Sequence, residues 1–214
     1  MKARIVMIAA SALALTLAPA ALATGHEVYV KYGEGMNAIP WWPHPTLPSV
    51  RCQMLFDNSY INYAGTVTEF KLEKSDANSA TFYNVKFYLC HTGLKSLTPT
   101  FSQNYGGNTP KMVASFATYK VPAVQGPYPI PMAETFAYNN VDNLLFEITW
   151  ESSDKSNVMC RVKNGSAANH RCFAWDYKAV TGTPDIIAYN ALIVFDKYPG
   201  VMPASLGRIK TLYR

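Results

Sequence analysis

Short stretches of alternating polar and apolar residues, each closed by Gly, Pro, Asn or Asp, run through most of the chain. A side-chain period of two is the pattern of a half-buried β-strand, and no amphipathic helix pattern separates these stretches. Only the stretch 94–101 is compatible with a helical turn. The predicted strands cover residues 27–32, 50–56, 65–72, 80–89, 111–119, 143–150, 158–162, 171–177 and 186–195. This succession predicts an all-β fold, a two-sheet antiparallel β-sandwich of jelly-roll type.

Composition agrees with this fold class. Charged residues make up 15% of the chain and aromatic residues 13%, which is typical of an exported all-β protein rather than a helical cytoplasmic enzyme. Two proline-rich passages stand out, "IPWWPHPTLP" (39–48) and "VPAVQGPYPIP" (121–131). Because proline cannot donate to a β-ladder, we expect these passages to cross between the sheets or to cover an open end.

The N-terminus has the pattern of a secretory signal peptide. Lys2 and Arg4 precede an apolar run, 5–17, and a tract of small residues ends at Ala23. That order of charged, apolar and small residues predicts a signal peptide over residues 1–23 and a protein that is secreted or held at the cell surface. An uncleaved N-terminal anchor is the alternative.

The remaining residues, 24–214, have the length of a single domain. The chain carries 19 Lys and Arg against 14 Asp and Glu, so losing Lys2 and Arg4 leaves 17 against 14, a formal charge of +3. These cations are scattered singly, which predicts no nucleic-acid partner. No later segment reaches the roughly 18 to 20 apolar residues of a membrane-spanning helix, so we expect no membrane span in the mature chain.

Three passages resemble a type of domain found in secreted and cell-surface bacterial proteins. They are "INYAGTVTEFKL" (61–72), "NVKFYLCHTGLKSLTPTFSQNYGG" (84–107) and "ETFAYNNVDNLLFEITW" (134–150). The resemblance covers roughly residues 45–150 and implies an uncharacterised all-β, jelly-roll-like module of a large exported protein. It supplies no catalytic residues. Cys90 stands where such domains usually have glycine, which suggests a local disulfide peculiar to this chain.

An even number of cysteines in an exported chain indicates disulfides rather than functional thiols. The four cysteines are Cys52, Cys90, Cys160 and Cys172. If residues 158–162 and 171–177 form a hairpin, Cys160 and Cys172 face each other, so we predict that they are bonded. Elimination then pairs Cys52 with Cys90.

Neither catalysis nor metal binding is expected at the histidines and cysteines. Cys90 and His91 are neighbours in a strand, so their side chains point to opposite faces and cannot pair as nucleophile and base. The nearest approach to a metal cluster is Cys160, His170 and Cys172, which we interpret as a crosslinked hairpin beside an exposed histidine. "NNVDN" (139–143) has the composition of an ordinary turn as well as of a calcium loop, and we predict no cofactor.

The carboxylates do not suggest a glycosidase either. Glu147 and Glu151 share one face of a strand, but four residues of strand separate them by roughly 13 Å, too far for paired catalysis. Alternation along 144–151 instead places both on the solvent side of a half-buried strand.

Alternation along the strands 80–89 and 143–150 predicts the core, which also includes Phe116 and Val194 from two other strands. The predicted core residues are Val85, Phe87, Leu89, Phe116, Leu144, Phe146, Ile148, Trp150 and Val194.

Trp41 and Trp42 are the possible ligand-binding residues. They lie between Pro40 and Pro43 on a stiff extended segment, where an exposed indole suits the apolar face of a sugar. The alternative is that one indole caps the core while the other lies over a sheet edge.

These observations favour a non-catalytic structural or adhesive module, whose partner is a cell-surface or extracellular protein or glycan. A carbohydrate-binding module is the alternative, and a glycan-active hydrolase is the third possibility.

Overall fold

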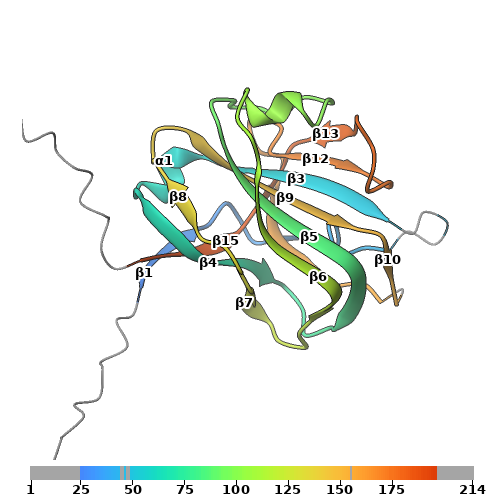
Figure 1. The fold of residues 1–214 in the computed structure, drawn as a ribbon. Helices are drawn as coiled ribbons and strands as arrows, with labels where there is room; N and C mark the ends of the chain where they lie inside the picture. The colour runs from blue at the N-terminus through green and yellow to red at the C-terminus, as the bar shows by residue number, and fades with distance from the viewer. Residues whose placement is uncertain (1–24, 44–45, 47–48, 155, 197–214) are drawn as a thin grey trace, which may run out of the picture.

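The computed structural model describes residues 25–43, 46, 49–154 and 156–196 (Figure 1). The predicted signal peptide lies outside these residues. Among the described residues, no helix is long and apolar enough to cross a membrane.

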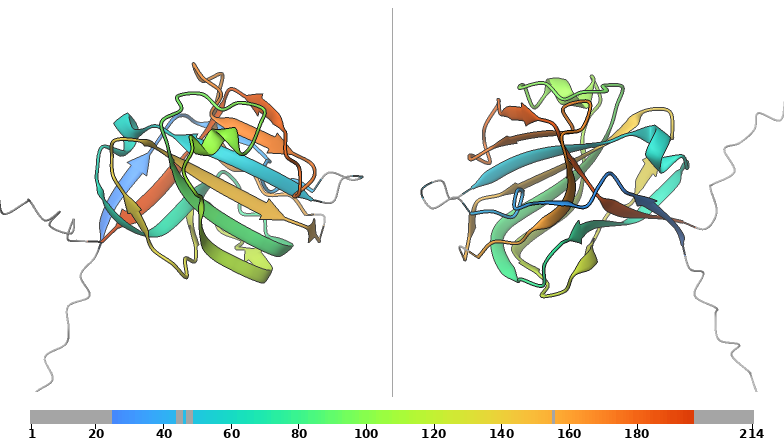
Figure 2. Two further views of the ribbon diagram at one scale, coloured as in Figure 1. Left: turned by 45° about the horizontal axis from the view of Figure 1, so that its top comes forward. Right: turned by 180° about the vertical axis from the view of Figure 1, so that it is seen from behind.

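Two antiparallel sheets pack face to face, which confirms the predicted β-sandwich (Figures 1 and 2). The first sheet has eight strands: β1 (His26–Val30), β2 (Gly35–Asn37), β4 (Gly65–Lys74), β7 (Gly126–Ile130), β8 (Phe136–Tyr138), β11 (Cys160–Asn164), β14 (Ile187–Tyr189) and β15 (Ala191–Phe195). The second has seven: β3 (Val50–Phe56), β5 (Ala80–Thr92), β6 (Lys111–Val121), β9 (Asn143–Trp150), β10 (Ser152–Ser153), β12 (Arg171–Ala174) and β13 (Thr183–Asp185). Two short helices, α1 (Asn58–Ile61) and η1 (Gln103–Tyr105), lie outside the sheets. The jelly-roll type stays a prediction.

Strand β9 lies in the middle of the second sheet. β9 pairs with β3 on one side and with β5 on the other. Beyond them, β12 pairs with β3, and β6 pairs with β5. Side chains on β5, β9, β3 and β12 therefore form rows across the sheet, and these rows position the site described below.

In the first sheet, β4 lies between β15 on one side and β7 and β8 on the other. β7 belongs to the proline-rich passage 121–131, which we expected to be a crossing or a cover. Pro127 and Pro129 are accommodated because, among the described residues, β7 pairs with β4 alone, so a missing N–H on the free side breaks no ladder bond.

The predicted strand 186–195 is divided at Asn190 into β14 and β15. The buried Asn190 Oδ1 accepts hydrogen bonds from the N–H groups of Tyr32 and Gly33, at 2.8 and 3.1 Å. Its Nδ2 donates to the Gly33 carbonyl and to Glu73, each at 2.8 Å. The backbone of Asn190 stays paired with Arg161 and Glu73, while its side chain ties the segment after β1 to the point where the strand is divided.

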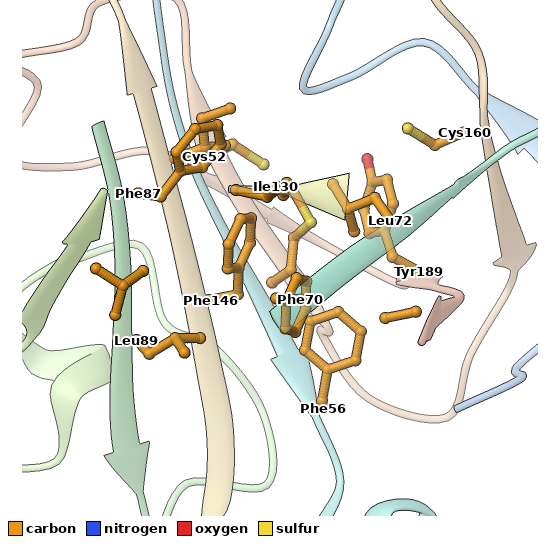
Figure 3. Packing of buried hydrophobic residues seen from close by; sticks show 14 of the residues in the cluster. Cys52, Phe56, Phe70, Leu72, Phe87, Leu89, Ile130, Phe146, Cys160 and Tyr189 are labelled. Carbon is orange, nitrogen blue, oxygen red and sulfur yellow. The ribbon is translucent and has the colours of Figure 1, made fainter. Parts of the chain in front are cut away.

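Aromatic side chains from both sheets fill the core between them (Figure 3). Phe70 of the first sheet stacks on Phe146 of the second, with ring centroids 4.5 Å apart. Seven of the predicted core residues are fully buried in this cluster: Val85, Phe87, Leu89, Leu144, Phe146, Ile148 and Trp150. Phe116 packs against it only partly buried. Val194 is buried as well, at 9% exposed, but it lies outside this cluster, because its neighbours Ile193 and Phe195 occupy the inward positions of β15.

Candidate functional site

The outer face of the second sheet is covered by protein over part of its area. The segment containing η1 lies over this face and joins the turn before β13 through a bridge between Thr100 and Thr181 (Figure 2). It encloses a small apolar group of side chains: Leu55, Cys90, Leu97, Phe101, Leu145 and Cys172. As a result every residue of β9 is buried, and Glu147 is only 3% exposed. The prediction that Glu147 lies on the solvent side is wrong.

Next to this covered area, a pocket of about 310 Å³ opens on the same face; we call it the Glu147 pocket. Two rows of paired residues form its floor. One row holds Lys86, Thr149 and Arg51, and the other holds Tyr88 and Glu147. The walls come from the segments beside the sheet and consist of Tyr105, Tyr177 and Lys178.

Glu147 organises the floor through both of its carboxylate oxygens. Oε1 accepts from Arg51, whose Nε and NH2 atoms lie 3.1 and 3.0 Å away. Oε2 accepts from Gln53 Nε2 and from the Tyr105 hydroxyl, each at 2.6 Å. Four charge-assisted contacts of this kind fix the carboxylate and its partners in one geometry.

Arg51 joins this floor to the walls. Its NH1 donates to the Ala179 carbonyl at 2.9 Å, and its NH2 donates to the Tyr105 hydroxyl at 2.9 Å. The guanidinium also lies over the Phe101 ring, 4.6 Å from its centroid. The same ion pair therefore holds β3, β9 and both covering segments together.

Two tyrosine hydroxyls of the pocket, those of Tyr88 and Tyr105, are neutral at physiological pH. Burial, followed by the nearby Glu147 carboxylate, raises the pKa of Tyr105. Burial and Glu147 likewise raise the pKa of Tyr88, with Arg51 opposing them. Both hydroxyls therefore remain able to donate hydrogen bonds.

The arrangement does not suit Glu147 to general acid or base chemistry. Both of its oxygens already accept from donors within the protein, and it is the one carboxylate among the described residues that line the pocket. Glu151 accepts a hydrogen bond from Asn84 at 3.0 Å and does not line the pocket.

The two predicted ligand-binding tryptophans have different environments. Trp41 is 0% exposed and packs in the core on Phe82 and Tyr119, with centroids 4.8 and 5.7 Å apart. Trp42 is 38% exposed and meets Trp175 edge to face at 5.4 Å. It lines a second hollow of about 360 Å³ near β2, together with Asn37, Met36 and others. Only Trp42 is therefore available to a ligand.

The hairpin predicted to bring Cys160 and Cys172 together is not formed. β11 belongs to the first sheet and β12 to the second, because the intervening residues cross between the sheets. All four cysteines are free in the structure.

The second predicted pair is also separated. Cys52 lies in the core between the sheets, whereas Cys90 lies in the covered group on the outer face. Cys90 and Cys172 share that group, but β9 and β3 lie between their strands, so about 14 Å of sheet separates them. Burial raises the pKa of Cys90 to about 11 and that of Cys172 to about 12.

Cys90 and His91 do point to opposite faces, as alternation predicts. The His91 ring lies against Phe136 and Tyr138 of β8, with centroids 4.8 and 5.8 Å away. Among the described residues, no three His, Cys, Asp or Glu side chains are grouped as metal ligands.

A chain of Ser166, His170 and Asp57 has the order of a catalytic triad, and sequence reasoning missed it because Asp57 is remote in the chain. His170 Nδ1 is 3.0 Å from Ser166 Oγ, and its Nε2 is 2.9 Å from Asp57 Oδ2. However, the Ser166 hydroxyl donates to the Ala168 carbonyl at 2.7 Å and the residue is only 8% exposed. The histidine cannot take a proton that is already directed elsewhere, so this cluster is interpreted as a structural clamp.

Comparison with known proteins assigns the chain to no family: no protein-family model matches it, and no curated protein matches it either.

Proposed function

We propose that the chain is a non-catalytic, exported carbohydrate-binding module of the adhesive kind, and that the Glu147 pocket holds the glycan. The observation that carries the proposal is the convergence of Tyr88 and Tyr177 on one pocket whose polar groups are held in place by the protein itself. Sites for sugars combine planar rings, which contact the apolar face of a pyranose, with a few fixed hydrogen-bonding groups.

Preorganisation strengthens this argument. Arg51 and Tyr105 are fixed by Glu147 before any ligand arrives, so little side-chain freedom is lost on binding. Thr149 on the floor and the hydroxyls of Tyr88 and Tyr177 supply donors and acceptors that match sugar hydroxyls.

The sequence alone favours a structural or adhesive module over a carbohydrate-binding module, because it shows no convergent polar site. The Glu147 pocket is such a site, formed from β3, β5, β9 and two covering segments. It therefore favours ligand binding over a structural role. A glycan hydrolase has less support, because Glu147 faces no second carboxylate among the described lining residues at the spacing that such enzymes need. Export itself rests on the pattern of residues 1–23.

Affinity electrophoresis of the purified protein against a panel of soluble glycans tests the proposal. We expect retardation by at least one glycan, and a loss of affinity of about tenfold or more for Tyr177→Ala. Tyr60→Ala is the matched control, because Tyr60 is 50% exposed and lies on α1, away from the pocket. Migration unaffected by every glycan, or equal retardation of the wild type and Tyr177→Ala, would contradict the proposal.

A further inference from the structure

We infer that the ligand of the Glu147 pocket is an acidic saccharide, one that bears carboxylate or sulfate groups, and that Lys86 and Lys178 bind those groups. This inference rests on the proposed function and narrows it to one class of glycan.

The charge balance of the lining is the first argument. Three cations and one carboxylate line the pocket: Arg51, Lys86, Lys178 and Glu147. Arg51 is neutralised by Glu147, and its remaining donors go to Ala179 and Tyr105. Two lysines are therefore left to meet a ligand.

Neither lysine is paired directly with a carboxylate close to the pocket, although Glu151 and Asp176 attract Lys178 from a longer distance. Glu151 accepts from Asn84 at 3.0 Å, and Asp176 Oδ1 accepts from the backbone N–H of Lys178 at 2.9 Å. Among the described residues, no ion pair joins Lys86 or Lys178 to a carboxylate within 4.0 Å. The Lys178 ammonium instead lies over the Tyr177 ring, 5.1 Å from its centroid.

The placement of the two lysines suits an extended ligand. Lys86 stands on β5, and Lys178 follows β12, so β9 and β3 lie between them. The floor itself spans β5, β9 and β3, and two strand spacings make it about 10 Å wide, which is long enough for more than one sugar ring. Tyrosine rings at the same pocket contact the rings of the sugar while the ammonium groups meet its acidic substituents.

The test compares acidic with neutral polysaccharides at two salt concentrations. Polygalacturonate and chondroitin sulfate are the acidic probes, and galactan and mannan are the neutral ones. We expect an acidic probe to bind more tightly, with affinity that falls as salt screens the lysines. Lys86→Gln and Lys178→Gln should each weaken that binding by about 3- to 10-fold.

Lys120→Gln is the matched control, because Lys120 is an exposed lysine on β6 that does not line the pocket. It should leave affinity unchanged. A neutral glycan that binds in a Tyr177-dependent way, with both lysine variants unaffected, would overturn this inference and leave the proposed function standing.

Two further outcomes would overturn the inference of an acidic ligand without deciding the proposed function. Equal losses in Lys120→Gln and the pocket variants, or equally tight binding of polyphosphate, would show attraction to any polyanion and overturn the inference. Binding to none of the four polysaccharides would also overturn it, and the wider glycan panel would then decide the proposed function alone.

Discussion

His170 ties the loop before β12 to the residue that follows β3. Burial disfavours its charged form, but the hydrogen bonds to Asp57 and to the Ala168 carbonyl together outweigh burial and raise its pKa above the usual value. A raised folded-state pKa means that the stabilisation is complete below the unfolded pKa of about 6.5 and is lost as pH rises through the folded value.

We therefore expect the free energy of unfolding to decline as pH rises across the neutral range. Urea unfolding at a series of pH values measures it. His170→Gln and Asp57→Asn should both flatten this part of the profile, because each removes one side of the charged pair. A wild-type profile that rises over this range, or one that both variants leave unchanged, would refute the role of His170.

Trp41 and Trp42 differ by one position but should differ widely in their contribution to stability. Trp41 is fully buried among aromatic rings, so Trp41→Ala should lower the free energy of unfolding by about 3 to 5 kcal/mol. Trp42 is 38% exposed and meets Trp175 edge to face, so Trp42→Ala should cost about 1 kcal/mol. Chemical denaturation of the two variants checks this; similar losses in both would contradict the assigned environments.

At the scale of elements, β9 is buried on both faces, so substitutions on either face should lower the free energy of unfolding. Glu147→Gln should cost about 3 kcal/mol or more, because it leaves the Arg51 guanidinium without its counter-charge under the covering segments. Combining it with Arg51→Met should cost less than the sum of the two single changes. A double-mutant cycle on unfolding free energies measures the coupling, and additive losses would show that the pair is not coupled.

The inner face of the same strand consists of large apolar side chains that are fully buried in the core. Phe146 stacks on Phe70 across the sheet interface and is fully buried, so Phe146→Ala should cost about 3 to 5 kcal/mol. Val194→Ala is the comparison, since Val194 lies outside the core cluster and should cost far less. A loss below about 1 kcal/mol for Phe146→Ala would place that ring on the wrong face.

Elements also show where sequence reasoning succeeds. Alternation placed Phe146 and Ile148 correctly inward because period-two patterning follows directly from strand geometry. It failed for Glu147, because the segment that covers the outer face comes from residues far away and has no periodicity to reveal it. The prediction of a hairpin from residues 158–162 and 171–177 failed for a related reason: the Gly, Ser and Asn residues between them suit a crossing between sheets as well as a tight turn.

For the molecule as a whole, the fold class could be predicted and the site could not. Many short strands with turn signals between them leave few options besides two packed sheets. The Glu147 pocket instead depends on which strands are neighbours, and that order brings Arg51 beside Glu147 although 96 positions separate them. The polar residues of β3 and β5 can be seen in the sequence. That they meet in one pocket can be predicted only when the register of the strands is known.

The first and last described strands of the molecule pair with each other, His26 opposite Phe195 (Figure 1). Closing so large a loop is entropically costly and slows folding, since long-range pairings form late. A circular permutant that links Gly25 to Asp196 by a short glycine-rich linker, and opens the chain at the exposed Val124, turns this pairing into a local hairpin. Stopped-flow refolding of the permutant should be faster than that of the parent chain, while the unfolding rate should change little. Refolding at the parental rate would mean that the β1–β15 pairing forms only after the rate-limiting step.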